Sequence, residues 1–206
     1  MTLLRLLQLA DSALPVGAAA HSFGIESLIE DAVLDVESLE SFLQGYLEEA
    51  GALDAAFCRA AHRSSPAEWQ NLNSRLSARK LARESREASL TLGRRLLNLA
   101  AGWMPDTTLP ADGHHVTAFG LVAGLAGIDE RSAVEAWLHQ SMTALISAVQ
   151  RLAPLGQTRA SNLLWNLKPH VAQVPDLRCS ETNSFTPVLD LAAMRHSRLS
   201  TRLFIS

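Results

Sequence analysis

The sequence predicts an all-α fold: a single-domain bundle of about seven to ten helices that takes in residues 1–206. Apolar residues recur at spacings of three and four along most of the chain, which is the period of an amphipathic helix. Helix-start signals and Gly or Pro breaks separate these stretches. No stretch alternates apolar and polar residues over the length of a β-strand. With 206 residues, of which 48% are hydrophobic, the chain is long and apolar enough for one packed domain.

The first expected helix is the Leu-rich segment over residues 1–10. Arg5 interrupts its apolar run and the acidic Asp11 follows it. A signal peptide instead has a basic start, an unbroken apolar stretch and a small-residue cleavage site. We therefore interpret this segment as a retained helix.

Two long helices are expected next. Residues 36–62 carry one apolar stripe, and Asp35 stands where an N-cap belongs. Ser65 and Glu68 flank a proline in the pattern of a capping box, which predicts a helix running from there to about residue 101.

The second half of the chain is divided by prolines and glycines. We expect loops over 103–113 and 168–183, and helices over 116–126, 129–153, 157–167 and 188–196. Gly120 and Gly124, four residues apart, permit another helix to pack closely against theirs. The final segment, 197–206, is expected to be a mobile C-terminal tail.

Composition excludes several classes of function. A net charge of −3 and a pI of about 6.2 argue against nucleic-acid binding by the whole chain. No apolar run reaches the roughly 18 residues that span a bilayer. Cys58 and Cys179 are the two cysteines; they could pair, but Cys58 lies on an apolar stripe typical of a buried, inert thiol. We expect a cytoplasmic protein that binds no membrane.

The seven histidines do not suggest a metal site. No pair has the HxxxH or HExxH spacing that places two imidazoles on one helical face. His114 and His115 are adjacent, and a structural role is the favoured interpretation for them. Metal bridging between subunits by His21 or His196 is left open.

No catalytic constellation is evident either. Ser22 lies beside His21 and near Glu26, but no G-x-S-x-G elbow or preceding strand exposes it. No phosphate-binding loop or dinucleotide fingerprint is present. The sequence therefore predicts a protein that is not an enzyme and that needs no cofactor.

Two segments look built for contact with other proteins. The stretch from Leu9 to Glu26 contains a bend at Pro15 and Gly17. The candidate partner-binding residues that follow this bend are His21, Ser22, Phe23 and Glu26. In the tail, arginines alternate with large apolar side chains, a composition typical of interface anchors. The candidates there are Arg198, Arg202, Leu203 and Phe204.

Five segments in order resemble the UreF family of urease accessory proteins. They are ADSALPVG with HSFGIE near the start, RESRE from Arg83, HH from His114 with AFG following, PLGQ from Pro154, and RLFIS at the end. The resemblance runs from residue 3 to residue 206.

That resemblance implies a non-enzymatic assembly chaperone. Members of the family form a homodimer, and they bridge a UreD/UreH-like accessory protein and a UreG-like GTPase so that two Ni²⁺ ions enter apo-urease. The resemblance also implies where partners or the second subunit dock. The two places are the corner from Pro15 to Glu26 and the turn at Gly156 and Gln157. A regulatory effect on the GTPase is a further expectation, and an arginine or lysine would be its physical means.

One alternative class stays open, an α-helical small-molecule-binding or regulatory domain. Its possible lining is the set of four tryptophans, Trp69, Trp103, Trp137 and Trp165. An assembly factor would retain protein partners from a cell extract, whereas a ligand sensor would retain none.

Overall fold

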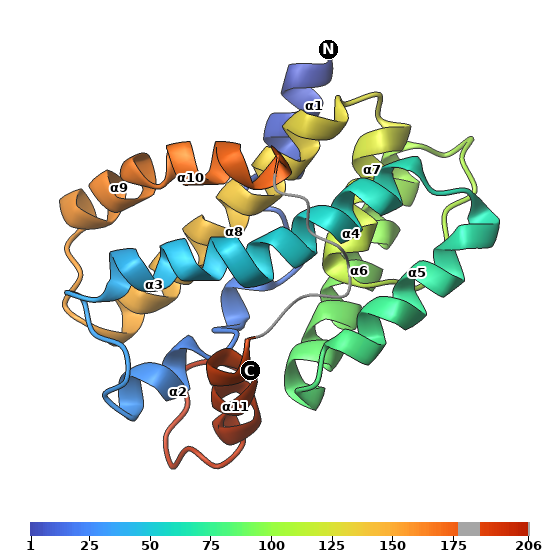
Figure 1. Ribbon diagram of the computed structural model, residues 1–206. Helices are drawn as coiled ribbons and strands as arrows, with labels where there is room; N and C mark the ends of the chain where they lie inside the picture. The colour runs from blue at the N-terminus through green and yellow to red at the C-terminus, as the bar shows by residue number, and fades with distance from the viewer. Residues whose placement is uncertain (177–185, 206) are drawn as a thin grey trace.

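The computed structural model describes residues 1–176 and 186–205, and all regular structure within those ranges is helical (Figure 1). The helices are α1 (Thr2–Leu9), α2 (Ile25–Glu30), α3 (Leu39–Tyr46), α4 (Ala52–Arg63), α5 (Pro66–Arg79), α6 (Arg83–Trp103), α7 (His115–Leu125), α8 (Glu130–Leu152), α9 (Gln157–Asn166), α10 (Lys168–Gln173) and α11 (Pro187–His196). Short 3₁₀ turns occupy η1 (Ala18–Ala20) and η3 (Val174–Asp176), and a π-helical turn, η2 (Leu47–Gly51), joins α3 to α4. When the continuous α3–α4 and α9–α10 rods are each taken as one, the described residues form nine helices. The all-α, single-domain prediction is confirmed.

The core is built around α7, which is buried on nearly all sides and packs against α4, α6 and α8. Two glycines make this possible, as their spacing predicts. A Cβ on Gly120 would overlap the carbonyl oxygen of Cys58, and a Cβ on Gly124 would lie 2.5 Å from that of His62. The α4 and α7 backbones are therefore closer than any larger residue would permit.

Two predicted helix starts are confirmed in atomic detail. Ser65 and Glu68 form a capping box, in which the Glu68 carboxylate accepts the Ser65 backbone N–H at 2.8 Å. The Asp129 carboxylate accepts the Ser132 N–H at 3.0 Å at the start of α8. Both caps satisfy N–H groups that the first turn of a helix leaves without partners.

Three boundaries differ from the sequence prediction. The helix expected over 36–62 begins only at Leu39, because Asp35 accepts the Ser38 N–H in a turn before it. The helix expected over 66–101 is broken between α5 and α6, where the Lys80 carbonyl turns to accept a bond from the Arg86 guanidinium. The loop expected from residue 168 starts instead with α10, because Pro169 lies in its first turn, where a missing N–H is harmless.

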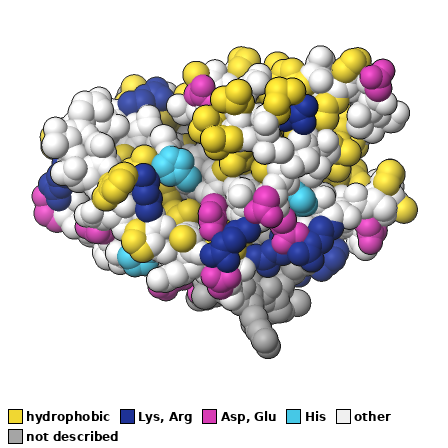
Figure 2. All heavy atoms as spheres, turned by 90° about the horizontal axis from the view of Figure 1, so that it is seen from above, with side chains coloured by type: hydrophobic (Ala, Val, Ile, Leu, Met, Phe, Trp, Pro, Cys, Tyr) yellow, Lys and Arg dark blue, Asp and Glu magenta, His cyan; other side chains and the backbone are white. Residues whose placement is uncertain are grey.

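Large apolar side chains are exposed at both ends of the molecule. Apolar side chains gather on the face seen in Figure 2, and the exposed apolar residues of α1 are Leu3, Leu4 and Leu7. At the opposite end, α11 packs on α2 beside the C-terminus (Figure 1). None of the helices in the described ranges combines the length and apolar character needed to cross a bilayer.

Candidate functional site

The corner after α1 is a rigid bend rather than a plain loop. The Asp11 carboxylate accepts the Ala13 N–H at 2.8 Å. Gly17 has φ 87°, a left-handed conformation that favours glycine, and a side chain there would overlap the Arg95 guanidinium. Arg95 itself donates to the Val16 carbonyl at 3.0 Å and so ties α6 to the corner.

A second bend directs the chain into α2. Phe23 has φ 53° and Gly24 has φ 93°. A left-handed phenylalanine costs about 1 kcal/mol or more, so the surrounding packing must hold it in place. Gly24 lies against α11, where a Cβ would stand 3.2 Å from the Leu189 carbonyl and 3.4 Å from the Ala192 methyl. The HSFG segment thus fixes how closely α2 and α11 approach.

The Glu26 carboxylate, buried at the start of α2, is the point where three distant segments meet. Its Oε2 accepts a bond from His196 Nε2 at 2.7 Å and from the Phe204 N–H at 3.3 Å. Its Oε1 accepts the Leu203 N–H at 2.6 Å. We call these four residues the Glu26 junction; it joins the corner, α11 and the tail.

Because the junction is buried, its polar groups depend on one another for hydrogen bonds. Glu26 is 5% exposed and His196 is 1% exposed, and a buried carboxylate without partners is strongly destabilising. A carboxylate only accepts hydrogen bonds, so Nε2 of His196 carries the proton. Removing either side chain, or displacing the tail, would leave a buried polar group without its partner.

The tail is docked on the protein, in contrast to the expected mobile segment over 197–206. Phe204 is buried beneath the Arg151 guanidinium, which lies 4.1 Å from the ring centroid. The Ile205 N–H donates to the Ala20 carbonyl at 2.8 Å, and Arg151 donates to the Ala19 carbonyl at 2.8 Å. Backbone bonds and one buried ring hold the tail; Ser206 lies outside the described residues.

The tail buries the Phe204 side chain and exposes the side chains on either side of it. Leu203 is 58% exposed and Ile205 is 71% exposed, on either side of the buried Phe204. Arg198 and Arg202 are exposed as well. The docked tail therefore exposes both apolar and basic side chains.

The structure brings most of the predicted partner-binding residues together. Glu26, Leu203 and Phe204 are in direct contact, and His21 and Ser22 are buried in the same corner. Burial lowers the pKa of His21, and the charges of Arg95 and His196 lower it further. The corner and the tail, which the sequence suggested as separate contact segments, pack against each other. Of the predicted residues in them, Arg198, Arg202 and Leu203 are exposed.

Gly156 and Gln157 lie apart from the corner and the tail. Gly156 is in the exposed turn between α8 and α9, next to the buried Leu155, and Gln157 is the exposed first residue of α9. Arg159, in the first turn of α9, donates to the Val36 carbonyl at 3.0 Å and so links this turn to the segment before α3. Gly156 and Gln157 are not part of the Glu26 junction.

His114 and His115 are held in the interior beside α6. The His114 ring contacts Ser77 Oγ at 2.8 Å and Ser89 Oγ at 3.1 Å. Burial, followed by the charges of Lys80 and Arg86, lowers the pKa of His114 to about 4. Packing therefore accounts for His114. In residues 1–176 and 186–205, no group of three or more His, Cys, Asp or Glu side chains is placed to hold a metal ion.

Two residues with defined contacts in the structure are not among those predicted from the sequence: Arg151 at the tail and Asp54 on α4. Arg151, which covers Phe204, looks from the sequence like an ordinary surface residue at the end of a long helix. Asp54 is a carboxylate on the buried stripe of α4, and its contact with the Trp137 indole at 3.1 Å shows that it faces inward. A charged residue amid an apolar stripe was the available signal for Asp54; the sequence held none for Arg151.

Comparisons with known proteins agree over nearly the whole chain. The family model described as UreF matches residues 33–168. The urease accessory protein UreF of Paenarthrobacter aurescens is 34% identical, with 98% of this chain and 97% of that protein aligned. The UreF of Nostoc sp. is 34% identical over 98% of this chain and 95% of its own length. The urease accessory protein F of Oryza sativa subsp. indica is 31% identical over 96% of this chain and 82% of its own.

Proposed function

Because the chain belongs to the UreF family of urease accessory proteins, we propose that it is an assembly chaperone for a urease. In this proposal it bridges a UreD/UreH-like accessory protein and a UreG-like GTPase, so that GTP-dependent delivery loads Ni²⁺ into apo-urease. Nickel is the cargo of the complex. The relatives are named as accessory proteins, and the chain is accordingly not an enzyme.

One observation carries the proposal: the Glu26 junction holds the tail so that its apolar and basic side chains point outward. Protein interfaces combine large apolar residues and arginine at their centres. Neighbouring α11 adds exposed Val188, Leu191 and Met194 at the same end of the molecule (Figure 1). We call these three residues together with Leu203 and Ile205 the C-terminal face.

The C-terminal face is the proposed docking site for the UreD/UreH-like protein. A Leu203→Asp, Ile205→Asp variant tests this assignment, because it charges the face while Phe204 and the backbone bonds stay in place. The matched control is Leu3→Asp, Leu7→Asp on α1, whose leucines are similarly exposed at the other end (Figure 1). The tail variant should lose the partner in a pull-down and the α1 variant should keep it. Equal retention by both would overturn the assignment.

A homodimer is part of the proposal, because a second copy would let one assembly hold two sets of partners. Most soluble oligomers of identical chains are closed and symmetric. Sedimentation of the isolated chain across a range of concentrations tests this point. A single species with the mass of one chain at every concentration would contradict it.

We extend the proposal to the GTPase, whose turnover the chain would regulate. A cation near the transferred phosphate stabilises the charge that develops there. The candidate cations are Arg202, Lys168 and Arg178. Arg202 is exposed on the docked tail, and the Lys168 ammonium is stacked on the Trp165 ring at 3.9 Å. Arg178 lies outside the described residues. GTP turnover measured with the other partners present should change when the chain is added. An unchanged rate would remove the regulatory role.

A further inference from the structure

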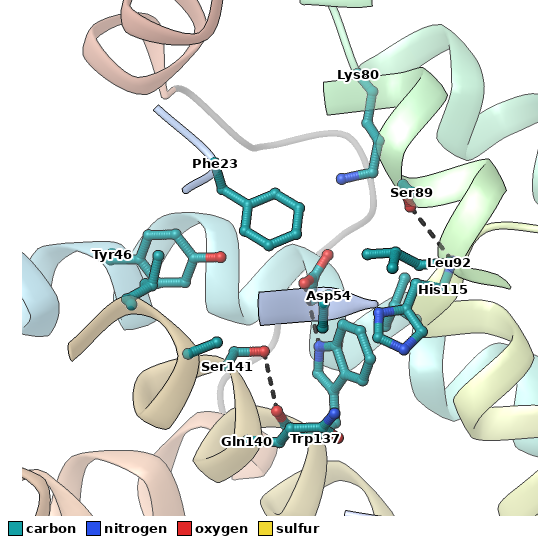
Figure 3. A pocket seen from close by; sticks show the side chains of 14 residues that line it. Phe23, Tyr46, Asp54, Lys80, Ser89, Leu92, His115, Trp137, Gln140 and Ser141 are labelled. Atoms are coloured by element: carbon teal, nitrogen blue, oxygen red, sulfur yellow. Dashed lines mark hydrogen bonds between the residues drawn. The ribbon is translucent and has the colours of Figure 1, made fainter. Parts of the chain in front are cut away.

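The turn between α5 and α6 holds a leucine at the surface. Lys80 points inward, and Figure 3 shows its side chain directed into the pocket that Asp54 also lines. On the other side of the turn Ala82 is buried, and Leu81 between them is 63% exposed. The Arg86 guanidinium donates to the Lys80 carbonyl at 2.8 Å and fixes the turn in this shape. Its neighbours on both sides therefore keep this apolar side chain in solvent.

Arginines surround the exposed leucine. Over residues 75–87, five basic and two acidic residues give a net charge of +3, in a chain whose total is −3. Arg75 and Arg83 are exposed, and the guanidinium of the half-buried Arg79 lies 5.9 Å from the centroid of a phenylalanine ring on α4. We call Arg75, Arg79, Leu81 and Arg83 the basic turn. A local excess of charge of this size attracts groups of the opposite sign.

The basic turn lies beside the C-terminal face. α6 packs on α11, which carries three residues of that face, and Figure 1 shows the α5–α6 turn next to α11. The charge of Lys80 acts on Asp190 of α11, where it opposes the rise that burial causes in the pKa of that carboxyl. The tail adds exposed Arg198 and Arg202 at the same end of the molecule. A single partner with an acidic surface would therefore meet positive charge on both.

The mixture of residues favours an acidic protein surface over a nucleic acid or a second copy of the chain. Glu84 and Glu87 stand among the arginines, and Arg83 pairs with Glu87 at 3.5 Å. These carboxylates would repel a phosphate backbone. In a symmetric pair of chains the same patch meets itself, so two basic turns would repel each other. Arginine beside a large apolar residue is typical of protein interfaces.

We propose that the basic turn binds an acidic segment of the UreD/UreH-like protein, with Leu81 packed against an apolar side chain of that segment. The inference rests on the proposed function, because it gives the partner of the C-terminal face a second contact at the same end of the molecule. Exposed charges at an interface mainly affect the rate of association, whereas buried contacts mainly affect the rate of dissociation. The arginines therefore attract the partner, and the apolar residues hold it.

Surface plasmon resonance with the purified UreD/UreH-like protein separates these two rates. The test variant is Arg75→Glu, Arg83→Glu. Its matched control, Arg63→Glu, Arg94→Glu, changes the net charge equally at exposed arginines elsewhere. At low salt the association rate constant should fall about tenfold or more in the test variant and about twofold or less in the control. At about 0.5 M NaCl, which screens exposed charges beyond a few ångström, the test variant and the wild type should associate alike.

Leu81→Ala tests the apolar contact. The side chain is exposed, so the variant should fold as the wild type does, and circular dichroism checks this point. The complex should dissociate about fivefold faster or more, which is the effect of truncating a contributing interface residue. Leu125→Ala, at the 46% exposed leucine that ends α7, is the matched control and should leave the dissociation rate unchanged.

Four results would overturn the inference. The first is association of the wild type that does not slow as salt is added, a measurement that needs no variant. The second is an equal association rate for the test variant and its control. The third is binding of a labelled single-stranded DNA that is lost in Arg75→Glu, Arg83→Glu, because the turn would then recognise phosphate. The fourth is loss of self-association in that variant alone, measured by sedimentation, because the turn would then join two copies.

The tail variant Leu203→Asp, Ile205→Asp keeps a failure of this inference distinct from a failure of the proposed function. If the partner needs these two tail residues but binds the arginine variants normally, the basic turn has no part in docking and the C-terminal face keeps its role. If the partner does not bind the wild-type chain at all, both assignments are wrong.

Discussion

The Glu26 carboxylate and the His196 imidazole meet 2.7 Å apart inside the protein, although 170 residues separate them in the chain. The same carboxylate accepts the N–H groups of Leu203 and Phe204. One buried side chain therefore holds α11 and the tail in position together. The shape of the C-terminal face depends on this contact.

Glu26→Gln should release the tail. An amide offers one acceptor oxygen and brings two donors, so it cannot serve His196 and both tail N–H groups. Losing charge-assisted bonds of this kind costs about 1 to 3 kcal/mol. Hydrogen–deuterium exchange should show faster exchange at Leu203 and Phe204. Glu30→Gln, on the exposed side of α2, is the matched control and should exchange as the wild type does; unchanged protection in Glu26→Gln would contradict the account.

Phe204→Ala should undock the tail with little loss of helix. The variant loses a buried ring and its stacking with Arg151. Its cost should be about 1 to 3 kcal/mol, below that of a central core phenylalanine, because the tail can detach without unfolding the bundle. Limited proteolysis should cut near the C-terminus while circular dichroism stays constant. Ile205→Ala, at an exposed position, should resist proteolysis like the wild type.

Gly120→Ala should destabilise the whole domain. The added methyl would overlap the Cys58 carbonyl, so α4 and α7 would have to separate, at a cost of about 1 to 3 kcal/mol. Gly102→Ala is the contrasting variant, because nothing lies within 4 Å of a Cβ there and it sits in the last turn of α6. It should be neutral or stabilising by up to about 1 kcal/mol. Chemical denaturation measures both, and equal midpoints would show that the close approach is not required.

His115 should make the protein less stable as the pH falls. Burial depresses its pKa from 6.5 to about 3. At a pH between these two values, the histidine is therefore protonated in the unfolded chain and neutral in the folded chain. Stability is then complete above pH 6.5 and declines as the pH decreases toward 3, by up to about 1.4 kcal/mol per pH unit. His115→Phe removes one titrating group and should reduce the slope measured between pH 5 and 6.5, leaving the part that His114 and His21 contribute. Leu145→Ala should lower stability at every pH without changing the slope; an unchanged slope in His115→Phe would refute the assignment.

The sequence predicts this fold well where local signals decide the structure. The capping box at Ser65, the cap at Asp129 and the small residues of α7 need only neighbours in the chain or a single close contact, and each is confirmed. The break at Lys80 has no Gly or Pro to announce it. It depends on the Arg86 guanidinium reaching back to its carbonyl.

The sequence predicted the two segments of the site separately, but it did not predict that they pack together. The corner and the tail each carry unusual residues, so both were found. Their meeting at Glu26 depends on how α2 packs on α11, which no local pattern encodes. The tail was expected to be mobile because terminal segments rarely have partners, and here a distant carboxylate and Arg151 provide them.

The most direct test of the assembly role is light scattering after size-exclusion chromatography of the chain mixed with its UreD/UreH-like and UreG-like partners. The account predicts one complex that contains all three proteins for the full-length chain. A chain lacking residues 197–206 should keep its helical content but elute without the UreD/UreH-like protein. If the full-length chain elutes separately from both partners, it does not act as the bridge proposed above.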